Sequence, residues 1–391
     1  MTLSKPLIGQ ADPIRVILVG AGLMGRNWLR VLTASPDVEV VGLVDLDVGL
    51  ARRVLKEADL EQVVAGPSVM DLAGATGAQA VIDVTVPVAH HAINTEALFG
   101  GLPVLCEKPI APTVSQALSL AAASEASGQL LMTSQSRRYY DNLTLFRQQV
   151  RSIGEVGIAT TEFFKGPHFG GFREEMAQPL LVDMAIHAFD AVRYLLDADP
   201  VSVYCETFNP SWSWYGGDAA TTAMFELAGG IRYIYNGSWC SGGLESSWNG
   251  SWRVSGSNGS AIWDGDNAPN VQFVEPPEEE QPDQALTQAG QGGGGEEIAG
   301  SLAEFVDALR TGRVPSGEVH SNVLSLAMVE AAVLSAESGQ RVFIDRVLED
   351  AYAEAVVTEA HPQVLGALKA WGSAKAAMSR YTIRGRRPHI I

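Results

Sequence analysis

The feature that most constrains this chain is a glycine-rich turn, GAGLMG, which directly follows the β-branched run IRVILV. A helical pattern begins within the turn. Gly20 permits the tight turn, Gly22 lets backbone N–H groups approach a pyrophosphate, and Gly25 lets the helix pack closely against the strand. Leu23 and Met24 complete the turn at the helix N-terminus, which favours an anion. The turn therefore predicts a βαβ unit that binds a dinucleotide.

An acidic residue follows the turn at the spacing that such a unit requires. The next β-branched run ends in VGLVDLD, which places Asp45 twenty residues beyond Gly25. A carboxylate at this position accepts hydrogen bonds from the adenosine ribose and repels a 2′-phosphate. No basic residue follows until Arg52, so the pattern favours NAD over NADP as the cofactor.

Short β-branched runs alternate with Ala- and Leu-rich helical patterns up to about residue 135. This alternation predicts parallel strands joined by right-handed crossover helices. Residues 1–135 are therefore expected to form an α/β Rossmann domain with a doubly wound parallel sheet. Ligands bind beyond the carboxyl ends of the strands in such sheets.

The pattern changes in residues 136–345. Helical patterns near 141–152 and 180–196 flank a strand at 156–165, and several strands follow between 199 and 275. Turns such as AGG and SNG between these strands predict hairpins. We expect an α+β domain with a large, mostly antiparallel sheet that has helices on one face. Burying the other face against a twin subunit predicts a homodimer or homotetramer.

The last part of the chain carries further helical patterns and a segment of unusual composition. Helical patterns return at 298–311 and 319–338, a short strand is expected at 342–344, and 346–391 is expected to be a helical tail. Residues 275–297 are acidic and glycine-rich, which is typical of a mobile loop. A lid over the active site is the alternative interpretation.

Composition limits the classes of partner. The formal net charge is -18, with 27 basic against 45 acidic residues, so nucleic acid and anionic membranes are not expected partners. No export signal and no membrane-spanning stretch is expected. Three widely spaced cysteines without a CxxC pair predict neither a disulfide framework nor a zinc site. The expected location is a reducing cytoplasm.

Two further motifs carry groups that can react. The fifth strand ends in CEKP, which places Lys108 at the strand end that faces the cofactor; Glu107 is expected to pair with a neighbour, and Pro109 to follow a cis peptide. In DMAIH, a spacing of four puts Asp183 and His187 on one helix face.

Together these motifs resemble the Gfo/Idh/MocA family of oxidoreductases, from about residue 14 to 342. The marks are GAGLMG, LVD, the segment from Pro87 to His91, CEKP, SRRYYD and DMAIH. The resemblance implies a Rossmann domain, a C-terminal domain whose sheet builds the oligomer interface, and a catalytic set of Lys108, Asp183 and His187. It also places Pro87, His91, Glu107 and Lys108 among the cofactor-binding residues.

The chain departs from the family pattern at two places. The usual Thr-Pro-Asn turn is here Val-Pro-Val, from residue 86 to 88, which puts one side-chain contact to the cofactor in doubt. The glycine-rich segment before the family's DxGxH motif is replaced by MAQPLLVDMAIH, which leaves the substrate pocket undefined.

The expected reaction moves a hydride between NAD and a secondary alcohol of a sugar, anhydrosugar or cyclic polyol. His187 is the first choice for the proton acceptor, oriented by Asp183, with Lys108 as a hydrogen-bond donor to the same oxygen. Lys108 as the base remains open.

Substrate contacts are expected from a cluster of aromatic residues and from a few polar ones. Six of the eight tryptophans lie between Trp212 and Trp263, and such rings pack on sugar faces. Tyr139 and His168 join Lys108, Asp183 and His187 as substrate-binding residues by position. The other histidines, His90 and His320 among them, are expected to serve packing or the surface, and no metal site is expected.

Two alternatives stay open. A tightly held, internally recycled NAD would make the chain an epimerase or a redox-type glycoside hydrolase, which would release no free NADH. A dehydrogenase fold that lost turnover would act as a NAD-binding regulatory protein, although Lys108, Asp183 and His187 argue against this.

Overall fold

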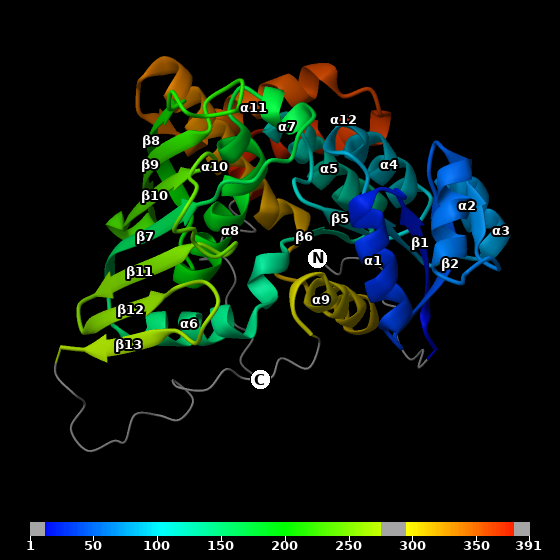
Figure 1. The fold of residues 1–391 in the computed structure, drawn as a ribbon. Helices are drawn as coiled ribbons and strands as arrows, with labels where there is room; N and C mark the ends of the chain where they lie inside the picture. Colours follow the sequence, from blue (N-terminus) through cyan, green and yellow to red (C-terminus); the bar gives the residue numbers. More distant parts are fainter. Residues whose placement is uncertain (1–11, 275–294, 379–391) are drawn as a thin grey trace. The chain divides into compact units, whose positions relative to one another are not determined.

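The computed structural model describes residues 12–274 and 295–378, and these form two compact units (Figure 1). The first unit comprises 12–136, 295–323 and 350–378, and the second comprises 137–274 and 324–349. The expected mobile loop, apart from its last three residues, and residues 379–391 of the expected helical tail lie outside the described residues.

A parallel sheet of six strands forms the centre of the first unit, in the order β3-β2-β1-β4-β5-β6. This order and the helices between successive strands confirm the doubly wound α/β sheet. The strands are near-continuous apolar runs because both faces of such a sheet are covered, and Ile17 and Leu18 are completely buried. The strands are β1 (Ile14–Val19), β2 (Val38–Val44), β3 (Val64–Gly66), β4 (Ala80–Asp83), β5 (Val104–Glu107) and β6 (Leu131–Ser134).

The crossover helices begin at residues that suit helix starts. The side chains of Asp47, Ser68 and Thr113 accept backbone N–H groups at the starts of three helices. The helices of this unit are α1 (Leu23–Ala34), α2 (Val48–Glu57), α3 (Val69–Thr76), α4 (Pro87–Phe99), α5 (Val114–Ser127), α9 (Glu297–Thr311), α12 (Pro362–Trp371) and α13 (Ala374–Met378). Helices α10 (Val319–Ser338) and α11 (Ile344–Thr358) contribute residues to both units.

Helix α10 is long and apolar enough to cross a membrane, which the sequence analysis had not expected of any segment. Its mean hydropathy is 1.4, and 78% of the apolar window is buried inside the protein. Burial on this scale is typical of the core helix of a globular domain.

The second unit contains a sheet of eight strands in the order β13-β12-β11-β7-β10-β9-β8-β14. Every neighbouring pair is antiparallel except β7 and β10, which run parallel. The expectation of a mostly antiparallel sheet is therefore confirmed. The strands are β7 (Val156–Phe164), β8 (Pro200–Phe208), β9 (Ala220–Leu227), β10 (Arg232–Ser238), β11 (Ser251–Gly256), β12 (Gly259–Trp263), β13 (Asn270–Phe273) and β14 (Val342–Phe343).

Helices of the second unit lie along one face of this sheet (Figure 1). The other face exposes apolar side chains at Ile158, Met224 and Ile262, which belong to β7, β9 and β12. The helical segments are η1 (Ser136–Tyr139), which begins at the end of the first unit, α6 (Asp141–Ser152), α7 (Phe172–Glu175), η2 (Leu180–Met184), α8 (Ala185–Leu196) and η3 (Ala228–Gly230).

A buried ionic cluster holds helix α12 against helix α5 in the first unit. His320 is completely buried, and its Nδ1 lies 2.5 Å from a Glu318 oxygen and its Nε2 3.1 Å from a Glu125 oxygen. The indole N–H of Trp371 donates to the other oxygen of Glu125 at 2.8 Å. Burial alone would lower the pKa of His320, but the charge of Glu318 and the bonds to both carboxylates outweigh it and raise the pKa to about 9.

The raised pKa of His320 predicts a stability that falls at alkaline pH. The folded state binds the proton more tightly than the unfolded chain does, so the stabilisation is complete below about pH 6.5 and lost as the pH rises through about 9. We expect the unfolding free energy to fall by roughly 3 kcal/mol across this range. Urea unfolding of the chain and of His320→Gln between pH 6 and 9.5 measures the effect; an equal slope in both would contradict the prediction.

Candidate functional site

The glycine turn lies between β1 and α1 and has the geometry of a pyrophosphate cradle. A Cβ on Gly25 would meet the carbonyl oxygen of Gly20 at 2.0 Å, and Gly20 itself has a φ of +104°. Gly22 precedes the first turn of α1, where no side chain caps the helix, and a Cβ there would meet nothing within 4 Å. The open N–H groups of this turn therefore fit the pyrophosphate of a dinucleotide.

Asp45 lies where its carboxylate can accept hydrogen bonds from the ribose hydroxyls of a dinucleotide. It follows the last residue of β2, and its Oδ2 accepts the backbone N–H of Ala21 at 2.8 Å. Its Oδ1 accepts the N–H of Asp47 at 2.8 Å. These two bonds fix the carboxylate beside the glycine turn.

Removing this carboxylate should weaken NAD binding and relax the selection against NADP. For Asp45→Ser we expect the KM for NAD to rise about 10-fold or more, because a hydrogen bond to a charged group contributes about 1.5–3 kcal/mol. Cofactor titrations with NAD and NADP measure the change. Asp47→Asn is the matched control, since the exposed Asp47 side chain caps α2 through the Leu50 N–H; an equal effect of both changes would count against this role for Asp45.

Strand β5 ends at Glu107 and places Lys108 at the carboxyl edge of the parallel sheet. The Glu107 carboxylate accepts the indole N–H of Trp28 at 2.9 Å and the backbone N–H of Lys108 at 3.0 Å. Burial raises the pKa of Glu107, while the Trp28 bond and the Lys108 charge oppose the rise. The expected pairing of Glu107 and the cis peptide between Lys108 and Pro109 are both present.

In the second unit, four neighbouring strands place a row of side chains on one face of the sheet. Thr161 on β7 lies opposite Tyr235 on β10 and Trp252 on β11, and Trp252 lies opposite Trp263 on β12. Directly opposite residues project from the same face of a sheet. All four line one pocket, which holds about 370 Å³ of empty space, part of it open to solvent.

Polar groups complete this pocket. His187 from α8, Arg137 from η1 and Asn249 line it, and Arg137 Nη1 donates to Asn249 Oδ1 at 2.7 Å. The hydroxyl of Tyr235 is buried and has no hydrogen-bond partner among the described residues. Burial raises the pKa of Tyr235 well above its usual range, so the hydroxyl remains a donor. The other lining residues are Leu143, Phe163, Met184, Ala188, Ala191 and Trp248.

Asp183 lies in a local irregularity of the chain. The turn from Leu180 to Met184 is π-helical, and the α-helix that carries His187 begins only at Ala185. The simple helix face predicted for Asp183 and His187 is therefore modified by a wider turn. Asp183 Oδ2 accepts the Arg173 Nε–H at 2.7 Å, in a half-buried ion pair.

The other residues expected to bind the substrate lie outside the aromatic pocket, with the exception of three tryptophans and one tyrosine. Asp183, Tyr139 and His168 are not among the residues that line the aromatic pocket. His168 is exposed and stacks on Trp214 with ring centres 3.9 Å apart. Three of the six clustered tryptophans line the pocket, whereas Trp212 is exposed.

Tyr235 belongs to the aromatic cluster expected from the sequence, whereas Arg137, Thr161 and Asn249 were not expected as pocket residues. Arg137 lies in SRRYYD, which served only as a family mark. Thr161 joins the site through its pairing with Tyr235, and Asn249 lies in the turn before β11, where it accepts from Arg137.

Two family profiles match this chain. The oxidoreductase family with an NAD-binding Rossmann fold matches residues 14–135, and the GFO/IDH/MocA C-terminal domain matches residues 148–262. Together they cover most of both units.

Two curated proteins are similar to this chain in sequence. An uncharacterised protein, y4oX, of Sinorhizobium fredii is 28% identical over 86% of this chain and 97% of its own length. Inositol 2-dehydrogenase 1 of Saccharopolyspora erythraea is 33% identical over 49% of this chain and 56% of its own length, so that match spans about half of each protein.

Solved structures share most of the fold. The WlbA dehydrogenase of Bordetella pertussis, solved with NADH and UDP-GlcNAcA, superposes with a TM-score of 0.73 at 20% identity, covering 86% of this chain and 99% of that one. The myo-inositol 2-dehydrogenase of Lactobacillus plantarum gives 0.68 at 21% identity, covering 85% and 99%. With its glycine turn, Asp45 and both profile matches, the chain belongs to the Gfo/Idh/MocA family of NAD-binding oxidoreductases.

Proposed function

We propose that this chain is a dehydrogenase that transfers a hydride between NAD and a secondary alcohol of a sugar, anhydrosugar or cyclic polyol. The observation that carries the proposal is the aromatic pocket of the second unit, which His187 lines together with Arg137, Tyr235 and Asn249. An imidazole beside aromatic faces and hydroxyl-binding groups suits a polyhydroxylated ring. Relatives named inositol 2-dehydrogenase support this substrate class.

In the proposed reaction the alcohol loses a hydride from carbon and a proton from oxygen. Bound NAD supplies the hydride acceptor. His187 or Lys108 takes the proton, and the other donates a hydrogen bond to the same oxygen. Asp183 is proposed to orient the catalytic groups, and its ion pair with Arg173 stabilises the ionised carboxylate. Pro87, His91 and Glu107 are retained as proposed cofactor residues, and Tyr139 and His168 as proposed substrate residues.

The buried Tyr235 hydroxyl offers a sharp test of substrate recognition. Tyr235→Phe removes a polar atom that has no partner among the described residues, so the change should not lower the unfolding midpoint. If the hydroxyl bonds the substrate, KM should rise about 5- to 10-fold, since one neutral hydrogen bond contributes about 1 kcal/mol. An unchanged KM with an unchanged midpoint would remove Tyr235 from the site.

The function itself is tested by incubating the protein with NAD or NADP and a panel of inositols, monosaccharides and anhydrosugars, and following the absorbance of reduced nicotinamide. Turnover with NAD supports the proposal. Tight NAD binding with no reduction on any substrate, but with conversion of a glycoside or epimerisable sugar, would favour an internally recycled cofactor. Binding without any conversion would indicate a regulatory protein.

We also propose that the open face of the second sheet buries against a second copy of the chain, as a homodimer or homotetramer. The exposed apolar side chains of Ile158, Met224 and Ile262 support this, because they lie on a face that a free monomer would leave to water. Light scattering of the chain and of a Met224→Glu variant tests it; a monomeric mass of the unaltered chain would contradict it.

A further inference from the structure

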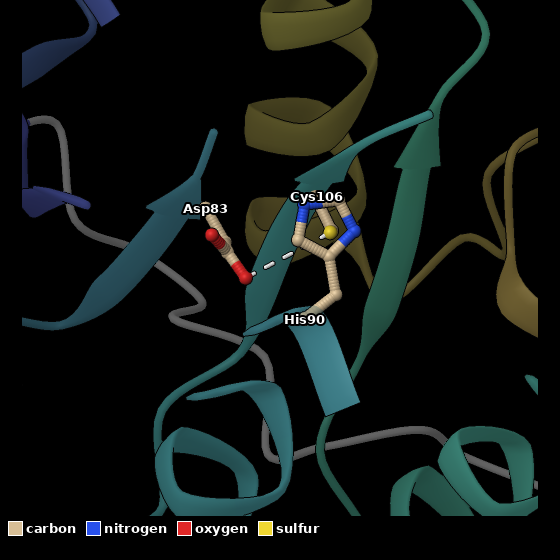
Figure 2. Close-up of side chains that lie close together, drawn as sticks. All are labelled: Asp83, His90 and Cys106. Carbon is tan, nitrogen blue, oxygen red and sulfur yellow. Dashed lines mark hydrogen bonds between the residues drawn. The ribbon is translucent and has the colours of Figure 1, made fainter. Parts of the chain in front are cut away.

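Three reactive side chains that precede Lys108 in the sequence lie together near the carboxyl ends of β4 and β5. Asp83 ends β4, Cys106 lies on β5 and His90 on α4, and Figure 2 shows the three side chains facing one another. Their ligand atoms lie within 4.8 Å of one another, and all three residues are completely buried. The proposed mechanism uses none of them.

His90 joins the two loops that leave these strands. Its Nδ1 lies 2.9 Å from the carbonyl oxygen of Pro109, and its Nε2 lies 3.1 Å from the carbonyl oxygen of Thr85. A carbonyl oxygen only accepts hydrogen bonds, so both contacts are made together only when both ring nitrogens carry a proton. Each ring nitrogen can therefore donate only to the loop that it faces, and His90 lies between the two loops.

A carboxyl oxygen of Asp83 lies within 4.8 Å of a ring nitrogen of His90 and of the Cys106 sulfur. The Asp83 carboxylate accepts the N–H and the hydroxyl of Thr85 at 3.0 and 2.7 Å, and the Cys106 thiol lies 3.9 Å from its other oxygen. Burial raises the pKa of Asp83, and the charge of His90 opposes this rise. Glu107 is the second carboxylate whose pKa the His90 charge lowers.

This hydrogen bonding argues against a metal ion in the cluster. A metal requires a bare imidazole nitrogen and a thiolate, whereas both nitrogens of His90 face carbonyl oxygens. Burial also raises the pKa of Cys106 well above its usual range, which keeps the thiol protonated.

We propose that His90 is a positioning residue for Lys108, holding the loop after β5 through the Pro109 carbonyl and anchoring it to the loop after β4 through Thr85. The inference rests on the proposed function of Lys108. Pro109, whose carbonyl oxygen His90 contacts, directly follows Lys108, and Glu107 accepts the backbone N–H of Lys108 on the other side. One bond thus holds the backbone N–H of Lys108, and a second bond, which depends on His90, holds the residue that follows it.

The test compares His90→Gln with His361→Gln, a histidine of the same unit that stacks on Phe99 instead. Glutamine carries both of its donor hydrogens on one nitrogen, whereas the two carbonyl oxygens face separate ring nitrogens of His90. We expect His90→Gln to lower kcat about 100-fold, since a misplacement of about 1 Å costs that much, while the KM for NAD changes less than about 3-fold. His361→Gln should keep kcat.

A double-mutant cycle separates positioning from general damage. In a Lys108→Ala background, followed by single-turnover kinetics, His90→Gln should lower the residual rate less than about 3-fold, because its target is already gone. A further 100-fold loss in that background would overturn the inference. If Lys108→Ala alone leaves kcat unchanged, the proposed function of Lys108 fails, and the inference with it.

A spectroscopic readout tests the contact between His90 and Pro109 directly. Nitrogen-15 NMR of histidine-labelled protein, assigned by loss of the signal in His90→Gln, should show a proton on Nδ1, the nitrogen that faces the Pro109 carbonyl. A bare Nδ1 would contradict the bond to the loop after β5. Stoichiometric zinc that disappears in His90→Gln would assign the cluster to a metal and also overturn the inference.

Discussion

Replacing His187 or Lys108 by alanine is expected to lower kcat by about 10²- to 10⁴-fold, because a positioned acid or base contributes that much to a proton transfer. The two residues come from different units: Lys108 follows β5 of the NAD-binding sheet, and His187 lines the aromatic pocket. NAD affinity should change little in His187→Ala, since the cofactor turn belongs to the other unit. Initial rates with the best substrate and NAD binding by fluorescence measure both effects.

Two control variants test whether the loss of kcat is specific to His187 and Lys108. Lys369→Ala removes an exposed lysine of α12, and His361→Gln removes a histidine that stacks on Phe99. Neither should change kcat. His361→Gln is expected to keep full kcat. If His187→Ala also keeps full kcat, the pocket around His187 is not the site of proton transfer.

The base can be identified by conservative changes. Lys108→Arg keeps a cation and a donor but cannot release a proton at neutral pH. Recovery of most of the kcat lost in Lys108→Ala would therefore identify Lys108 as a donor and His187 as the base. A loss equal to that of Lys108→Ala would favour Lys108 as the base.

The first sheet and its cofactor turn could be predicted because local sequence specifies them. Gly20, Gly25 and Asp45 are fixed by backbone geometry and spacing, and the apolar runs mark each parallel strand. Such signals need no knowledge of distant contacts. Local sequence did not indicate the contacts of His90 with Thr85 and Pro109, because these depend on how two loops meet.

The substrate pocket could be predicted only in part. The aromatic cluster was visible in the sequence, but the row from Tyr235 through Thr161 to Trp252 depends on the register of three strands. Register between strands distant in sequence follows from packing of the whole sheet. The π-helical turn at Asp183 likewise has no local signal that distinguishes it from an α-helix.

Breaking the buried ion pair between Arg138 and Asp190 should have the largest effect on stability. Arg138 Nε and Nη2 donate to the two Asp190 oxygens at 2.7 and 2.6 Å, and Ser325 donates to Asp190 at 2.7 Å. Both side chains are almost completely buried. Asp190→Asn removes the carboxylate that a buried guanidinium contacts through two bonds, so we expect a loss of about 3–5 kcal/mol, measured by urea unfolding.

The surface pair between Arg151 and Asp197 is the matched control, because its side chains are 56% and 37% exposed. Water and salt screen such a pair, so Arg151→Gln should cost less than about 1 kcal/mol. Replacing both partners of the buried pair, as Arg138→Met with Asp190→Leu, should cost less than Asp190→Asn alone, since no charge is then left buried. If Asp190→Asn costs no more than Arg151→Gln, the buried pair between η1 and α8 contributes no more to stability than an exposed pair does.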